Sequence, residues 1–89
     1  MGARRDAEGT VYLLHFEQAL RGARHYIGWT SNLDARVARH RRGGASFTGR
    51  FVAAGIGFRL ARTWAGTPSL ERELKRVGHA RLCPLCQRA

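Results

Sequence analysis

The sequence has no long run of apolar residues. A membrane-spanning helix needs roughly 20 consecutive apolar residues, and no stretch of the 89-residue chain approaches that length. The N-terminal residues include charges where a signal peptide would have its apolar segment. We therefore expect a cytoplasmic protein that does not enter a membrane.

Cysteine is also scarce, since the chain has only Cys83 and Cys86. They lie too close in sequence to cross-link distant parts of the chain. Their spacing is that of half a zinc site, and His79 lies four residues before Cys83. A fourth ligand would have to be His15, His25, a water molecule or a residue of a second chain. We expect reduced thiols, and the alternatives are a close-spaced disulfide and a structural Zn²⁺ site bound by His79, Cys83 and Cys86.

Acidic side chains are few as well. Asp and Glu number six against sixteen Lys and Arg, so the formal net charge is +10, and fifteen of the sixteen cations are arginine. The arginine guanidinium binds phosphate through two parallel hydrogen bonds. The basic residues are spread over the whole chain, which disfavours the single amphipathic helix of a membrane-surface protein. The charge therefore predicts a nucleic acid partner, with DNA first and RNA as the alternative.

The length and composition predict one small domain. The hydrophobic fraction of 44 % and the charged fraction of 25 % are those of an ordinary globular protein. Residues 1–9 are polar and lack periodicity, which predicts a loose N-terminal arm. We expect the folded domain over residues 10–82 and a short tail over residues 83–89, with no internal repeats.

Two short apolar segments predict neighbouring antiparallel strands. The first runs from Thr10 to Phe16 and is apolar enough to be a central strand covered on both faces. The second runs from His25 to Thr30, because the connection Glu17–Ala23 is too short for a crossover. Alternation along the second strand places Tyr26 on one face and Trp29 on the other. Whether Tyr12 shares the face of Tyr26 depends on the register, which the sequence leaves open.

A helix is predicted to follow the second strand. Ser31 or Asn32 can cap it, and Leu33 and Val37 form its apolar stripe. Arg36 and His40 lie four residues apart along one edge of that stripe. At this position an arginine can point into a cleft and hold a phosphate.

Three further elements are predicted in the second half of the chain. Residues Ser46–Ala54 form a short helix. Residues Phe58–Trp64 form a third strand with Phe58, Leu60 and Trp64 facing inward. The pair Thr67-Pro68 starts a helix that runs to about Arg81, with a capping hydroxyl and proline at the first position. The expected buried stripe of this helix is Leu70, Leu74 and Val77.

Taken in order, these motifs resemble those of the GIY-YIG endonuclease family. Tyr26-Ile27-Gly28 is the second half of that name, and Val11-Tyr12-Leu13 is a degenerate form of the first half. Arg36 and His40 follow on the predicted helix. Glu71-Arg-Glu-Leu-Lys75 is similar to the family's glutamate followed four residues later by lysine. The resemblance covers residues 10 to about 81.

The resemblance implies an α+β fold, a small three-stranded antiparallel β-sheet flanked by helices. It also implies hydrolysis of a phosphodiester in DNA with one divalent cation, Mg²⁺ or Mn²⁺. By position, Tyr12, Tyr26, Arg36 and His40 match the catalytic residues, and Glu71 matches the metal ligand. The specificity would be for a DNA structure or a lesion, or else weak, and a homodimer would form if both strands are cut.

The chemistry of hydrolysis calls for these residue types. Attack by water on phosphorus needs a base, and a phenol with a pKa near 10 serves only if cations lower that pKa. Arg36 or a metal ion would lower the pKa of Tyr12. Glu73 is a rival to Glu71 on the same helix, but only Glu71 has lysine at the family spacing. Some members carry lysine at the position of Trp29, so any role of that lysine is absent here.

The basic residues expected to contact the nucleic acid backbone are Arg39, Arg41, Arg42, Arg50 and Lys75. Each candidate residue also has an ordinary structural interpretation. Tyr12 and Tyr26 fit a core, Arg36 fits a surface, and Glu71 fits a helix ion pair with Lys75. A non-catalytic nucleic-acid-binding domain with the same fold is therefore the alternative function, and a structural protein of a ribonucleoprotein is the third.

Overall fold

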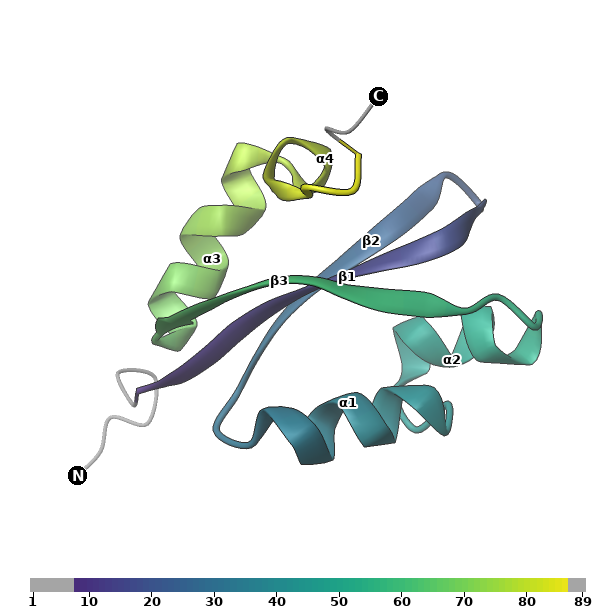
Figure 1. The fold of residues 1–89 in the computed structure, drawn as a ribbon, viewed down its shortest axis with the longest axis horizontal. Helices are drawn as coiled ribbons and strands as arrows, with labels where there is room; N and C mark the ends of the chain where they lie inside the picture. The colour runs from purple at the N-terminus through teal and green to yellow at the C-terminus, as the bar shows by residue number, and fades with distance from the viewer. Residues whose placement is uncertain (1–7, 87–89) are drawn as a thin grey trace.

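The computed structural model describes residues 8–86 and has an α+β fold (Figure 1). The expected three-stranded antiparallel sheet flanked by helices is confirmed, with strand order β2-β1-β3. Most of the expected N-terminal arm, residues 1–7, lies outside the described residues, as do residues 87–89 of the expected tail. The elements are β1 (Gly9–Leu20), β2 (Ala23–Thr30), α1 (Leu33–Arg41), α2 (Ser46–Ala53), β3 (Phe58–Gly66), α3 (Pro68–Val77) and α4 (His79–Leu82).

The hairpin of β1 and β2 is longer than expected. Most of the predicted connection Glu17–Ala23 belongs to the strands, and the turn is confined to Arg21 and Gly22. Both turn residues have positive φ, at 52° and 84°, which suits the twist of a tight hairpin. The register pairs Tyr12 with Gly28 and His15 with His25.

The two faces of the sheet bury two separate clusters of side chains. On the side of α1 and α2, Tyr12, Leu14 and Phe16 pack with Phe51 and Phe58. On the side of α3 and α4, the core consists of Val11, Leu13, Ile27 and Cys83. Figure 1 shows the two helix pairs on opposite sides of the strands. The alternation expected for β1 and β2 is therefore confirmed, and Tyr12 and Tyr26 share a face.

The prediction that Phe58, Leu60 and Trp64 of β3 face inward together is wrong in part. Leu14 pairs with Leu60 and Leu13 pairs with Arg62, so Ala61 is an extra residue that reverses the alternation. Phe58 lies on the α1 and α2 side, whereas Trp64 packs on the α3 and α4 side. Leu60 is 40 % exposed.

The helices α1 and α2 begin close to where the sequence places them. Asn32 caps α1, and its side-chain oxygen accepts a hydrogen bond of 3.2 Å from the backbone N–H of Ala35. Leu33 and Val37 pack against the buried core as predicted. The chain leaves α1 through Gly43, whose φ of 77° favours glycine.

The last predicted helix is divided into α3 and α4. Gly78 has φ of 111°, which helical backbone does not allow, so α3 ends at Val77 and not near Arg81. Thr67 occupies the N-cap position, but its side chain makes no capping hydrogen bond. Leu70 and Leu74 pack against the core as expected, whereas Val77 is 47 % exposed. None of the helices in residues 8–86 is long and apolar enough to cross a bilayer.

Candidate functional site

The Tyr12 side chain lies at the centre of the residues that the sequence singles out. It projects from the middle strand and has no exposed surface. Its cross-strand neighbour is Gly28. A Cβ atom at Gly28 would lie 2.5 Å from the Tyr12 hydroxyl oxygen and 2.9 Å from Cε2 of Tyr26. Glycine is therefore required at position 28, because it leaves the space that both rings occupy.

A buried hydrogen-bond chain connects Tyr12 to His40 and Thr48. The Tyr12 hydroxyl lies 2.8 Å from Nε2 of His40, and Nδ1 of His40 lies 2.7 Å from Oγ1 of Thr48. Burial lowers the pKa of His40, and the charges of Arg36 and Arg39 lower it further. A neutral imidazole has one N–H donor and one acceptor nitrogen, which matches its two partners. Thr48 was missed at the sequence level, because no motif marks a threonine of a short helix.

Aromatic rings surround the same hydroxyl. The Tyr26 ring lies 6.1 Å from the Tyr12 ring and 5.2 Å from the His40 ring, measured between centroids. Phe47 of α2 stacks on Tyr26 at 5.5 Å and is itself 36 % exposed. The sequence predicts α2 but does not indicate that Phe47 would lie beside Tyr26.

Arg36 and Glu71 also act on Tyr12. The pKa of the Tyr12 phenol is raised to about 12: burial raises it most, while a hydrogen bond from Arg36 and the positive charge of Arg36 lower it. The Tyr26 phenol and the Glu71 carboxylate raise the Tyr12 pKa through Coulombic repulsion. Arg36 lowers this pKa as expected, but desolvation outweighs the cation, so the pKa in the protein alone stays above 10.

The Glu71 carboxylate lies on the first half of α3 with its side chain 23 % exposed. Its Oε2 atom lies 2.9 Å from Nζ of Lys75, so the ion pair considered as an alternative is present. Glu73, the rival ligand, is exposed. Of the two glutamates, Glu71 is the one whose charge affects the Tyr12 pKa.

The other predicted basic residues lie at the surface of α1 and α2. Arg39, Arg42 and Arg50 are exposed, and the Arg39 guanidinium donates a 3.3 Å hydrogen bond to the Gly44 carbonyl. Arg41 is exposed as well, and its guanidinium carbon lies 4.5 Å from the centre of the Phe58 ring. Arg41 therefore covers the core in addition to carrying charge.

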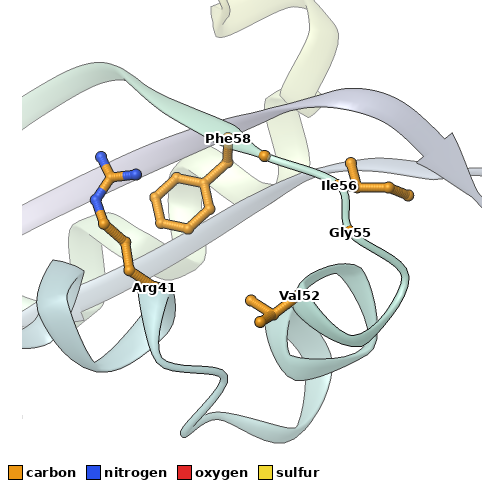
Figure 2. A pocket seen from close by; sticks show the side chains of 6 residues that line it. Arg41, Val52, Gly55, Ile56 and Phe58 are labelled. Carbon is orange, nitrogen blue, oxygen red and sulfur yellow. The ribbon is translucent and has the colours of Figure 1, made fainter.

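A surface hollow beside Arg41 is separate from the Tyr12 site. Its volume is about 240 Å³, and it lies between the end of α1, α2 and the start of β3 (Figure 2). Its lining residues are Arg41, Val52, Gly55, Ile56, Gly57 and Phe58. The hollow holds no carboxylate, histidine or cysteine, so it offers neither a metal ligand nor a proton acceptor.

A second group of reactive side chains lies on the α3 and α4 side of the sheet. One ligand atom from each of His15, His25, Cys83 and Cys86 lies within 4.8 Å of the others, so these four residues could hold a metal ion. His79, a candidate ligand of the alternative zinc site, is outside this set, and its ring centre is 6.3 Å from that of His25. The two cysteines are free thiols, as expected.

The expected tail over residues 83–89 begins inside the domain. Cys83 is fully buried with Val11, Leu13 and Ile27, and Leu85 packs against the same cluster. The short turn from Cys83 to Cys86 is therefore part of the fold and not an appended end.

No protein-family model, no curated protein and no solved structure matches the chain. The Tyr12 site combines a phenol, a neutral imidazole, a guanidinium and a carboxylate. The first two groups can transfer a proton, and the last two can hold a phosphate and a cation.

Proposed function

We propose that the protein is a metal-dependent endonuclease of the GIY-YIG type that hydrolyses phosphodiester bonds in DNA. One observation carries the proposal. Tyr12, Tyr26 and His40, from β1, β2 and α1, meet around the Tyr12 hydroxyl, and the charges of Arg36 and Glu71 affect the pKa of its phenol. Separate structural roles for these residues would not require them to meet.

Arg36 is suited to hold the scissile phosphate. Its side chain is half-buried, and its Nη1 atom is 3.5 Å from the carbonyl oxygen of Trp29, a long hydrogen bond. Such a bond costs little to break, so the guanidinium can turn to a phosphate and form two parallel hydrogen bonds. Its positive charge then offsets the negative charge that develops on the phosphate oxygens during attack.

Tyr12 and His40 are suited to move a proton together. The Tyr12 pKa of about 12 makes the free phenolate a rare species at neutral pH. Once substrate binding admits water to the buried phenol, a neutral His40 accepts the phenolic proton at Nε2 while the phenol oxygen takes a proton from the attacking water. The nascent hydroxide forms the bond to phosphorus and the bond from phosphorus to the sugar oxygen breaks. The departing oxygen takes a proton from solvent, and the protonated His40 returns its proton to solvent.

Glu71 would hold the divalent cation. It offers one half-buried carboxylate whose charge affects the Tyr12 pKa, and Mg²⁺ commonly binds one or two carboxylates together with substrate phosphate. When bound, the cation neutralises charge on the phosphate and the leaving oxygen. Because Lys75 pairs with Oε2 of Glu71, cation binding competes with that ion pair.

A second candidate is a basic domain that binds nucleic acid without cutting it. It is favoured by the complete burial of Tyr12 and the raised pKa of its phenol, which a purely structural tyrosine would also have. The net charge of +10 supports either function.

The experiment that separates the two candidates is a nicking assay on branched, nicked, single-stranded and duplex DNA with Mg²⁺, Mn²⁺ or a chelator. We expect cleavage by the wild type with either cation. Glu71→Gln should abolish cleavage and leave DNA affinity nearly unchanged. Glu73→Gln, two residues away and exposed, is the matched control and should cut normally. A wild-type protein that binds DNA but cuts no substrate under any of these conditions would leave the binding domain as the function.

A further inference from the structure

Four side chains from distant parts of the sequence direct ligand atoms to one point beside the hairpin. His15 and His25 face each other across β1 and β2, with Nδ1 and Nε2 3.3 Å apart. The Cys83 sulfur lies 3.4 Å from Nδ1 of His15. The Cys86 sulfur lies 3.7 Å from the same nitrogen and 3.3 Å from Nε2 of His25.

Hydrogen bonds account for only some of these contacts. Nδ1 of His15 has three neighbours at 3.3–3.7 Å, namely Nε2 of His25 and the two sulfur atoms. A ring nitrogen carries either one hydrogen or one lone pair, so it can make one good hydrogen bond in its ring plane. The other two neighbours of Nδ1 therefore lie at contact distance without a good hydrogen bond to it. Atoms that approach in this way are ordinarily held by a common cation.

The distances correspond to a tetrahedral zinc site. Zinc binds imidazole nitrogen at about 2.0–2.1 Å and thiolate sulfur at about 2.3 Å. At tetrahedral angles, these bond lengths place two nitrogens about 3.3 Å apart and a nitrogen and a sulfur about 3.5 Å apart. The observed separations of 3.3 Å between nitrogens and 3.3–3.7 Å between nitrogen and sulfur agree with both values.

We propose that His15, His25, Cys83 and Cys86 bind one structural Zn²⁺. The four protein ligands fill a tetrahedral shell and leave no position for a substrate, which distinguishes a structural site from a catalytic one. Two thiolates and two neutral imidazoles balance the charge of the ion. Soft sulfur ligands select zinc over magnesium, so this site is chemically distinct from the Glu71 carboxylate.

The surrounding fold holds the four ligands in place. The histidines come from one cross-strand pair of the β1–β2 hairpin. The cysteines come from a turn closed by a 3.2 Å hydrogen bond from the Cys86 N–H to the Cys83 carbonyl. Pro84 occupies the second position of that turn, which proline favours. Cys83 is anchored further by its complete burial among Val11, Leu13 and Ile27.

The ion would fasten the end of α4 to the hairpin. The helix α4 contacts both β2 and α3, so the fastening also limits the movement of α3 against the sheet. A zinc ion is therefore expected to stabilise the half of the core that lies on the α3 and α4 side.

Metal content and thermal unfolding of the purified full chain test the proposal, with no reference to nuclease activity. We expect about one zinc per chain and a lower melting temperature after removal of zinc by a chelator, reversed by added Zn²⁺. Loss of an outer-shell partner alone costs about 10–100-fold in metal affinity, so His25→Asn should weaken zinc binding at least a hundredfold. His79→Asn is the matched control, because its ring lies beside His25 outside the ligand set, and it should retain zinc.

Two further measurements keep the proposal falsifiable if a variant of buried Cys83 fails to fold. Cys86 is exposed, so Cys86→Ser should fold and should lose zinc. Protein loaded with Co²⁺ should show thiolate-to-cobalt absorption that is weaker in Cys86→Ser. The proposal is overturned if the folded protein takes up neither zinc nor cobalt, if unreduced protein has the mass of a Cys83–Cys86 disulfide, or if His79→Asn and His25→Asn lose zinc equally.

Discussion

The Tyr12 hydroxyl is subject to opposing effects. Loss of solvent disfavours the phenolate and raises its pKa, whereas Arg36 stabilises the phenolate and lowers the pKa. Burial is the larger effect, and the result is a pKa of about 12. The hydroxyl is consequently a hydrogen-bond donor at neutral pH, and His40 beside it provides the acceptor nitrogen.

Replacing Tyr12 by phenylalanine should affect both catalysis and stability. Under the proposed nuclease function, Tyr12→Phe should lower the rate of cleavage at least about a hundredfold. It also leaves Nε2 of the buried His40 without a partner, which should cost about 1–3 kcal/mol of unfolding free energy. Single-turnover cleavage and urea denaturation measure the two effects.

Tyr26→Phe is the control for this variant, because the contacts of Tyr26 are made by its ring. It should cost less stability than Tyr12→Phe. A Tyr12→Phe protein with wild-type rate and stability would show that the hydroxyl serves neither purpose.

The pH dependence of stability should reveal the neutral His40. Its pKa in the folded protein is below the ordinary value of 6.5, so below pH 6.5 the unfolded chain binds a proton that the folded protein does not. His40 should therefore have no effect on the pH dependence above about pH 7, and it should make stability fall as the pH drops below 6.5. Denaturation of wild type and His40→Gln between pH 5 and 8 should show a shallower decline for the variant. Parallel curves would mean that His40 titrates normally.

At the scale of elements, the separation of α3 from α4 depends on the backbone of Gly78. A Cβ atom there would meet no atom closer than 3.9 Å, so space does not exclude a side chain. The φ of 111° does exclude one, because residues other than glycine rarely adopt this backbone angle. The direction in which the chain leaves α3, and so the position of the Cys83–Cys86 turn, follows from this one residue.

Gly78→Ala should destabilise the protein by about 1–3 kcal/mol through backbone strain. Gly57→Ala is a matched control, since Gly57 has no positive φ and its Cβ would make ordinary contacts at 3.5 Å. Chemical denaturation of both variants checks the prediction. Equal stability of the Gly78→Ala and Gly57→Ala variants would mean that a side chain at position 78 causes no backbone strain.

The strands and most helix starts could be predicted because alternation and capping are local properties of the sequence. The side of the sheet on which Trp64 lies could not be predicted, because the extra residue Ala61 becomes visible only when β3 is paired with β1. The full set of candidate metal ligands could not be predicted for the same reason. Cys83 and Cys86 are recognisable by spacing, whereas the choice of His15 and His25 over His79 depends on strand register and on the bend at Gly78.

The sequence proposes the candidate residues of the Tyr12 site one by one, but it does not predict their electrostatics. Order along the chain identifies Tyr12, Tyr26, Arg36, His40 and Glu71 as candidates. Burial cannot be predicted from the order of residues along the chain. The raised pKa of Tyr12 and the contact between His40 and Thr48 are therefore visible only in the folded structure.

At the scale of the whole molecule, positive charge is the dominant property. A net charge of +10 on 89 residues should attract a polyanion over distances longer than any single contact. Arg39, Arg42 and Arg50 add exposed charge to the side that carries α1 and α2.

The affinity for duplex DNA should fall steeply with salt. We expect the plot of log affinity against log salt concentration to have a slope steeper than about −3. Replacing Arg39 and Arg42 by alanine should weaken binding alike for all sequences and make the slope shallower by about 2. Replacing Arg59 and Arg62 on β3 removes the same charge elsewhere and should change the slope less. Fluorescence anisotropy measures all three proteins, and a flat salt dependence of the wild type would contradict the role of charge.

The burial of Cys83 also sets an order of events during synthesis. Cys83 is translated 68 residues after His15, the residue whose ring it contacts. The hairpin of β1 and β2 can pair long before Cys83 leaves the ribosome. Val11, Leu13 and Ile27 remain uncovered by the Cys83 side chain for all of that interval. The α3 and α4 side of the core is thus the last to be covered as the chain is made.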